Sequence, residues 1–181
     1  MMGGSILMEC LTNLTHPDEA DFQSPFILTV GGAKWSVASD RAWVVGVRGA
    51  GPWLPWETSP ERLERVQRLL SLSAPPTAAT ITVAEILAWT GEPTEDILEG
   101  RFCGVMVDAK RIATILTGLP FAKVLVWDAS ELAHMPAVAF SAGDRWRAIL
   151  AGLGPDCVPQ LDSFDPTVSR KLFDAVMALE D

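Results

Sequence analysis

Seven of the 14 basic residues of this 181-residue chain fall on three stretches with helical patterning. Arg62, Arg65 and Arg68 recur at every third position, Lys110 and Arg111 open a second stretch, and a further pair stands on the last one. Residues three apart lie along one side of a helix, where cations can meet the phosphates of a nucleic acid. Such contacts position a protein on DNA without reading its sequence. We therefore predict weak, nonspecific contact with duplex DNA through Arg62, Arg65, Arg68, Lys110 and Arg111.

The same spacing is also typical of ordinary solvated helix faces, on which arginines pair with acidic neighbours. Glu61 and Glu64 stand close enough in sequence to pair with the arginines of the first stretch. Both interpretations stay open at this point. The DNA-binding hypothesis further requires that the two basic stretches share one surface of the folded protein.

A loop rich in tryptophan is the second group of residues that could bind a partner. Trp53, Leu54 and Trp56 stand among Gly and Pro residues in the segment 49–58. Large apolar groups are seldom left exposed without a reason, and Trp is enriched at binding hot spots. We predict that Trp53, Leu54 and Trp56 dock a protein partner of unknown identity. The alternative is that both indoles fold back onto the domain.

Residue types that serve in catalysis or metal binding form no recognisable pattern. Neither His16 nor His134 has a second ligand four residues away, and the sequence contains neither a nucleophile elbow nor a phosphate loop. The three cysteines are widely spaced, which favours buried thiols in a reducing compartment over disulfide bonds or a zinc site. We predict a protein that is not an enzyme and has no catalytic residues, metal site or cofactor.

The net charge of the chain excludes some classes of binding partner. Asp and Glu total 23 against 14 Lys and Arg, which gives a formal net charge of −9. This excess excludes a polybasic nucleic-acid tail and argues against binding to an anionic membrane. No apolar run approaches the roughly 18 residues that a membrane span needs, and the N-terminal residues lack the basic region of a secretory signal. We expect a cytoplasmic protein without membrane contact.

Turn and cap signals divide the chain into strands and helices. Gly31-Gly32 between two apolar runs predicts a tight hairpin, Ser59-Pro60 predicts the start of a helix, and the breakers at 73–77 mark a boundary. Strands are predicted over 26–30, 34–38, 42–47, 80–83, 102–107, 123–127, 137–140 and 145–150. Helices are predicted from 59 to about 70, over 84–89 and 109–119, and from 165 onward.

These elements predict an α+β fold of antiparallel sheets with amphipathic helices on one face. We expect a single domain over 1–154, made of two half-units at about 1–73 and 77–154. A linker and a C-terminal helix over 155–181 would follow it.

The second half of the chain carries the residues of a family resemblance. The segment 107–116 has the sequence Val-Asp-Ala-Lys-Arg-Ile-Ala-Thr-Ile-Leu, which predicts a helix that begins after a short polar residue. A predicted strand at 123–127 follows it. A Pro-led strand at 136–140 and a final strand at 146–150 complete the order, and the segment 35–41 looks similar in the first half. This order resembles a half-domain of the bacterial DNA polymerase III β subunit, the sliding clamp.

The resemblance implies two pseudo-repeated strand-helix-strand units whose helices line a hole that encircles DNA. A clamp chain is much longer than this one, so ring closure would need a different oligomer. Because unpaired strands at the edges of a sheet are natural pairing sites, we expect a homodimer or a larger ring.

A short segment near the C-terminal helix also resembles a sequence associated with sliding clamps. Gln-Leu-Asp-Ser-Phe at 160–164 resembles the peptide through which many proteins dock on the β clamp, although Ser163 replaces an apolar residue. The alternative is a linker whose Leu161 and Phe164 pack on the domain.

Two hypotheses of function follow from these observations. The first is a non-enzymatic, clamp-like binding protein of DNA replication or repair, with weak nonspecific contact to duplex DNA. The second is a small acidic accessory or inhibitor protein that binds a basic protein partner without touching DNA. The distribution of charge separates them: a cationic face apart from acidic loops favours the first, and uniform acidity favours the second.

Overall fold

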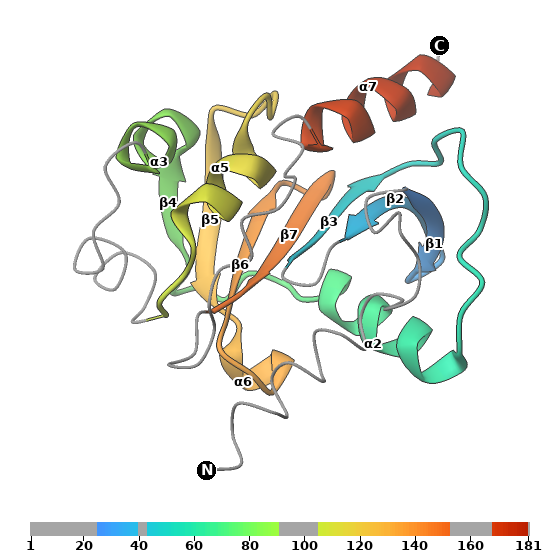
Figure 1. Ribbon diagram of the computed structural model, residues 1–181, viewed down its shortest axis with the longest axis horizontal. Helices are drawn as coiled ribbons and strands as arrows, with labels where there is room; N and C mark the ends of the chain where they lie inside the picture. The colour runs from blue at the N-terminus through green and yellow to red at the C-terminus, as the bar shows by residue number, and fades with distance from the viewer. Residues whose placement is uncertain (1–24, 40–42, 91–104, 153–167, 181) are drawn as a thin grey trace.

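The computed structural model describes residues 25–39, 43–90, 105–152 and 168–180 (Figure 1). The strands are β1 (Phe26–Val30), β2 (Ala33–Ser39), β3 (Trp43–Arg48), β4 (Ala79–Thr82), β5 (Lys123–Asp128), β6 (Ala137–Ala142) and β7 (Trp146–Ala151). The helices are α2 (Pro60–Leu70), α3 (Val83–Thr90), α5 (Ala109–Leu116), α6 (Ser130–Ala133) and α7 (Val168–Glu180). These elements confirm the predicted α+β class.

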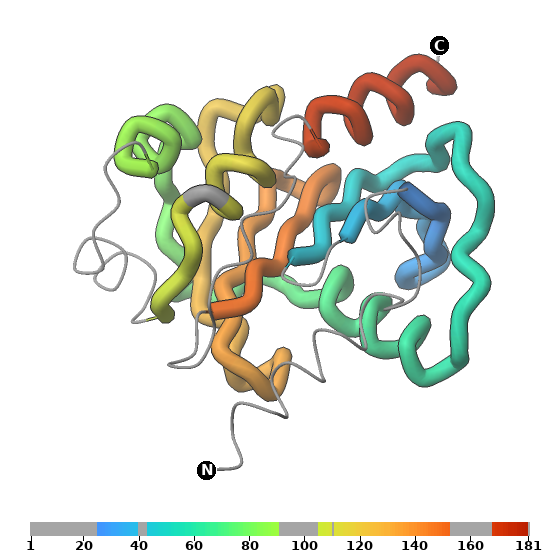
Figure 2. Tube along the Cα trace, in the orientation of Figure 1, coloured from blue at the N-terminus to red at the C-terminus, as the bar shows by residue number. Residues whose placement is uncertain are grey.

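The seven strands form one antiparallel sheet with the order β1-β2-β3-β7-β6-β5-β4. The sheet therefore consists of two meanders, β1–β3 and β4–β7, which join where β3 pairs with β7 (Figure 2). The first meander is followed by α2, whereas α3, α5 and α6 interrupt the second, so the described elements do not show the pseudo-repeat that we expected.

The Gly31-Gly32 hairpin is confirmed. Both glycines have positive φ, 56° and 81°, and Val30 pairs directly with Ala33 across a two-residue turn. The helix start at Ser59-Pro60 is also confirmed, because the Ser59 hydroxyl accepts a hydrogen bond from the Arg62 backbone N–H at 3.4 Å.

One predicted strand was wrong over its described part. Residues 105–107 of the predicted strand 102–107 belong to no strand, and the remainder of it lies outside the described residues. Val105 and Val107 are nevertheless buried in the core. The alternation of apolar residues thus indicated which residues are buried, although the described part of this segment belongs to no strand.

The prediction that the helices lie on one face of the sheet was also wrong. One core lies between the sheet and α3, α5 and α7, and a second core lies between the opposite face and α2. In Figure 1, α7 and α2 lie on opposite sides of strands β1–β3. The physical reason is visible in β3 and β6, whose consecutive residues are nearly all buried: strands that are apolar on both sides need cover on both faces.

The two edges of the sheet differ. At the outer side of β1, the Ile27 N–H donates to the Leu54 carbonyl at 2.9 Å and the Trp56 N–H donates to the Ile27 carbonyl at 3.1 Å. The loop after β3 therefore covers part of this edge, while β4 is the edge at the other end. The homodimer stays a prediction, and β4 is the edge that could serve it. No helix in the described ranges is both long and apolar enough to cross a membrane.

Candidate functional site

The structure separates the two predicted groups of helix-borne cations. Arg62, Arg65 and Arg68 lie on α2, where Arg65 and Arg68 are exposed and Arg62 is partly buried. Arg68 pairs with Glu64 at 3.2 Å, so an acidic neighbour does hold an arginine of this helix, as the alternative interpretation expected, although at i,i+4 spacing and not at the expected i,i+3.

Lys110 and Arg111 lie on α5, which covers the opposite face of the sheet. The Arg111 side chain is buried beside Asp108, with Nε 3.4 Å from the carboxylate, and offers little surface to a ligand. The side chain of Lys110 lies outside the described part of the structure. The helix-borne cations are therefore not brought together on one surface.

The tryptophan loop folds back onto the protein. Trp53 packs against the core under α7, and its ring lies so close to Gly51 that a Cβ there would come within 2.1 Å of it. Trp56 stacks on Phe26, with ring centroids 4.6 Å apart and an angle of 25° between the rings. Of the three residues, only Leu54 is largely exposed, with 83% of its surface in solvent. The two indoles thus have a clear packing role, and partner binding by Leu54 stays a prediction.

We expect Trp56→Ala to lower the free energy of unfolding by about 1–2 kcal/mol, because Trp56 is only partly buried and loses one stacked ring. Leu54→Ala is the control and should change it by less than about 0.5 kcal/mol, since an exposed side chain loses few contacts. Urea unfolding measures both variants. Equal destabilisation by the two would contradict the placement of the loop.

The fold assembles a different set of cations at one end of the sheet. Lys34 is the second residue of β2, Arg48 is the last residue of β3, and Arg145 directly precedes β7. Backbone bonds hold these ends side by side: the Arg48 N–H donates to the Arg145 carbonyl and the Gly49 N–H to the Lys34 carbonyl, both at 2.8 Å. Around them lies an open hollow of about 380 Å³, also lined by Asp144 and Glu180. We call this the sheet-end hollow.

Each arginine of the sheet-end hollow has a carboxylate partner. Arg48 Nη1 lies 2.7 Å from Asp144, and Arg145 Nη1 lies 3.1 Å from Glu180. All four side chains keep roughly half or more of their surface in solvent, so both pairs are open to water. Lys34 is exposed and makes no ion pair within the described residues. Three cations thus face two carboxylates, which leaves the hollow a positive excess.

A further arginine, Arg147 of β7, does not line the hollow and contacts the core on the α2 side of the sheet. Its guanidinium lies over the Trp35 ring, 5.5 Å from the centroid, and donates to the Leu70 carbonyl at the end of α2. Burial lowers the pKa of Arg147 from its ordinary value; Asp144 opposes this shift and Arg48 adds to it. Since an arginine stays protonated in proteins, the group still contributes a full charge next to Arg48.

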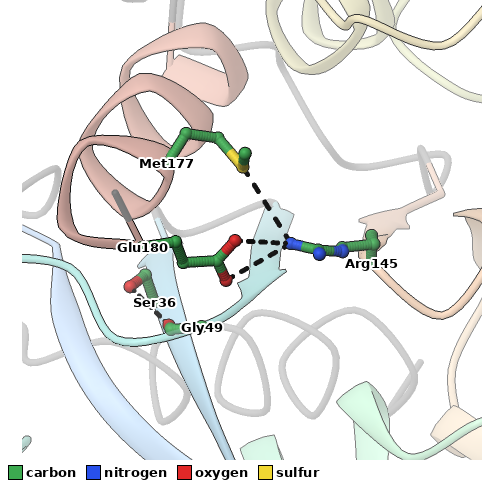
Figure 3. A network of polar contacts seen from close by, with 5 residues as sticks. All are labelled: Ser36, Gly49, Arg145, Met177 and Glu180. Carbon is green, nitrogen blue, oxygen red and sulfur yellow. Dashed lines mark hydrogen bonds and ion pairs between the residues drawn. The ribbon is translucent and has the colours of Figure 1, made fainter.

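The Ser36 side chain holds the backbone at the rim of the sheet-end hollow. The Ser36 hydroxyl donates to the Gly49 carbonyl at 2.9 Å (Figure 3). The same hydroxyl accepts from the Gly51 N–H at 2.7 Å. Gly49 has φ of 131°, and a Cβ on it would lie 2.3 Å from Val176 of α7. These contacts fix the chain that leaves β3 and let α7 approach the rim.

Charge is distributed unevenly along the sequence. Twelve of the 14 Lys and Arg residues lie in the described ranges, but only 10 of the 23 Asp and Glu residues do. The described ranges therefore carry a formal excess of two positive charges, although the whole chain carries −9. The acidic excess of the chain thus lies, in sequence, in the segments outside the described ranges.

No group of three or more His, Cys, Asp or Glu side chains in the described part of the chain is placed to hold a metal ion. In comparisons with protein-family models, curated proteins and solved structures, nothing matched this chain.

Proposed function

We propose that this protein is a non-enzymatic binding protein that makes weak, sequence-nonspecific contact with duplex DNA through the sheet-end hollow. The observation that carries the proposal is the meeting of Lys34 and Arg48 with Arg145, which is distant from both in the sequence, on three neighbouring strand ends. Cations that neutralise phosphates release counterions, and this release supplies nonspecific affinity. The clamp-like resemblance points to the same ligand.

Two features of the protein weaken the proposed contact with DNA. Asp144 and Glu180 hold two of the three cations, and a phosphate must compete with them. The chain's net charge of −9 also opposes the approach of DNA. We expect a dissociation constant no tighter than the nonspecific range, about 10⁻⁴–10⁻⁶ M, and a steep loss of affinity with added salt.

The experiment compares two triple variants in a titration of a short labelled duplex at low salt. K34Q/R48Q/R145Q removes the cations of the sheet-end hollow, and R62Q/R65Q/R68Q removes the arginines of α2. Each variant loses three positive charges, so any long-range effect of net charge is matched. We expect the first variant to bind at least about tenfold more weakly than the wild type. The slope of log K against log salt concentration should become shallower by up to about 0.9 for each lost phosphate contact. The second should stay within about threefold of the wild type.

Circular dichroism and thermal unfolding of both variants check that the fold is intact. Two results would overturn the proposal. The first is no DNA association by the wild type at low salt, in which case the acidic accessory protein becomes the better hypothesis. The second is a loss of binding in the α2 variant equal to or greater than that in the sheet-end variant, because the contact would then not lie at the hollow.

A further inference from the structure

The last turn of α7 reaches into the sheet-end hollow. Residues Val168, Leu172, Phe173 and Val176 bury one side of this helix against the core. Val176 lies against the bare backbone of Gly49, and one turn later Glu180 stands at the wall of the hollow. The helix is therefore packed in a way that delivers a carboxylate to a cationic site.

Glu180 holds Arg145 with both of its oxygens. Arg145 Nη1 donates to Oε2 at 3.1 Å and to Oε1 at 3.3 Å, and it also contacts the Met177 sulfur at 4.0 Å (Figure 3). The pair is about half exposed on both sides. A solvent-exposed ion pair contributes little to stability, so an anion that binds Arg145 can replace Glu180 at low cost.

The ion pair is not what docks α7. Four buried apolar residues anchor the helix, and the Ser169 hydroxyl also donates to the Ile115 carbonyl of α5. A carboxylate in the last turn of a helix is moreover disfavoured by the helix dipole. Glu180 thus stands at a position where the helix itself gains nothing from its charge, and the contact it makes is with a cation of the hollow.

We propose that Glu180 is an anionic latch, which occupies Arg145 in the free protein and is displaced when a phosphate binds. This inference rests on the proposed function, because it concerns how tightly the same hollow takes its ligand. The latch favours ligands with several phosphates in a row, such as duplex DNA. An extended polyanion reaches Lys34 and Arg48 at the same time as it competes for Arg145, whereas a single small anion does not.

The test is Glu180→Gln, which keeps the shape of the side chain and removes its charge. We expect it to bind the short labelled duplex about two- to fivefold more tightly than the wild type at low salt, the range that corresponds to one exposed ion pair. Asp174→Asn is the matched control. It removes one acidic charge from the same helix, but Asp174 pairs with Arg170 on α7 at 2.9 Å and does not line the hollow. Its affinity should stay at the wild-type value.

Repeating the Glu180→Gln substitution in an Arg145→Gln variant distinguishes a local latch from a long-range effect of charge. When Arg145 is already changed to Gln, adding Glu180→Gln should give no further gain, because the latch has nothing to hold. A gain of the same size in both backgrounds would overturn the latch, and so would equal affinities of the Glu180→Gln and Asp174→Asn variants.

The outcomes for the two proposals are distinguishable. If the wild type binds DNA, K34Q/R48Q/R145Q does not, and Glu180→Gln binds like the wild type, the latch is wrong and the sheet-end contact stands. If neither the wild type nor Glu180→Gln binds at low salt, the proposed function itself fails.

Discussion

Trp146→Ala should lower the free energy of unfolding by about 3–5 kcal/mol, the range for loss of a fully buried large aromatic side chain. Trp146 has no exposed surface, and it belongs to β7, the strand that joins the two meanders. It stands directly between Val47 of β3 and Ala142 of β6. Its removal leaves a cavity that these neighbouring strands cannot fill without breaking their ladders.

Trp53→Ala provides the comparison for Trp146→Ala. Trp53 is the same residue type on the edge of the same core, but it is only partly buried. We expect it to cost about 1–2 kcal/mol, because fewer packing atoms are lost and less cavity is left. Urea unfolding with intact far-ultraviolet circular dichroism measures both. A loss below about 1 kcal/mol for Trp146→Ala would contradict its place at the centre of the sheet.

The hairpins and the first long helix could be predicted because their signals are local. Gly31-Gly32 permits the positive φ that a two-residue turn requires. At the start of α2, the Ser59 side chain accepts a backbone hydrogen bond, and Pro60 has the φ that the first helical turn needs. Each of these interactions is complete within a few residues. The α+β class follows from the same local signals, since it needs only the types of element and not their neighbours.

The side of the sheet on which each helix packs could not be predicted in this way. The prediction of a single covered face took the helices as one amphipathic layer, although consecutive apolar residues such as Val44 and Val45 indicate a strand that is buried on both sides. Arg62 and Arg111 were correctly placed on helices but wrongly on a common surface. Which face a helix covers is decided by packing between distant segments.

The sheet-end hollow shows the same limit for the candidate site. Lys34 follows one predicted hairpin turn and Arg145 follows another, so each could have been placed at a turn from the sequence. Their meeting with Arg48 depends on the pairing of β3 with β7, which are separated by nearly a hundred residues. Nothing in the local pattern of either strand specifies its partner.

Gly49→Ala is expected to have the second largest effect on stability, a loss of about 2–4 kcal/mol. Two costs act together. A φ of 131° is strained for a residue with a Cβ, and that Cβ would lie 2.3 Å from Val176 Cγ1. Gly31→Ala is the control, because its φ is +56° and no atom lies within 4 Å of the added Cβ. It should cost only about 1–2 kcal/mol from backbone strain.

The contact between Gly49 and α7 can be isolated with a double variant. Val176→Ala alone should cost about 1–3 kcal/mol, since Val176 is fully buried. In combination with Gly49→Ala, the smaller side chain makes room for the new Cβ, so the double variant should be more stable than the sum of the two losses implies by about 0.5–2 kcal/mol. Thermal and urea unfolding of all four proteins complete the cycle. Strict additivity would mean that α7 does not rest on Gly49, and the placement of Glu180 at the hollow would lose its structural support.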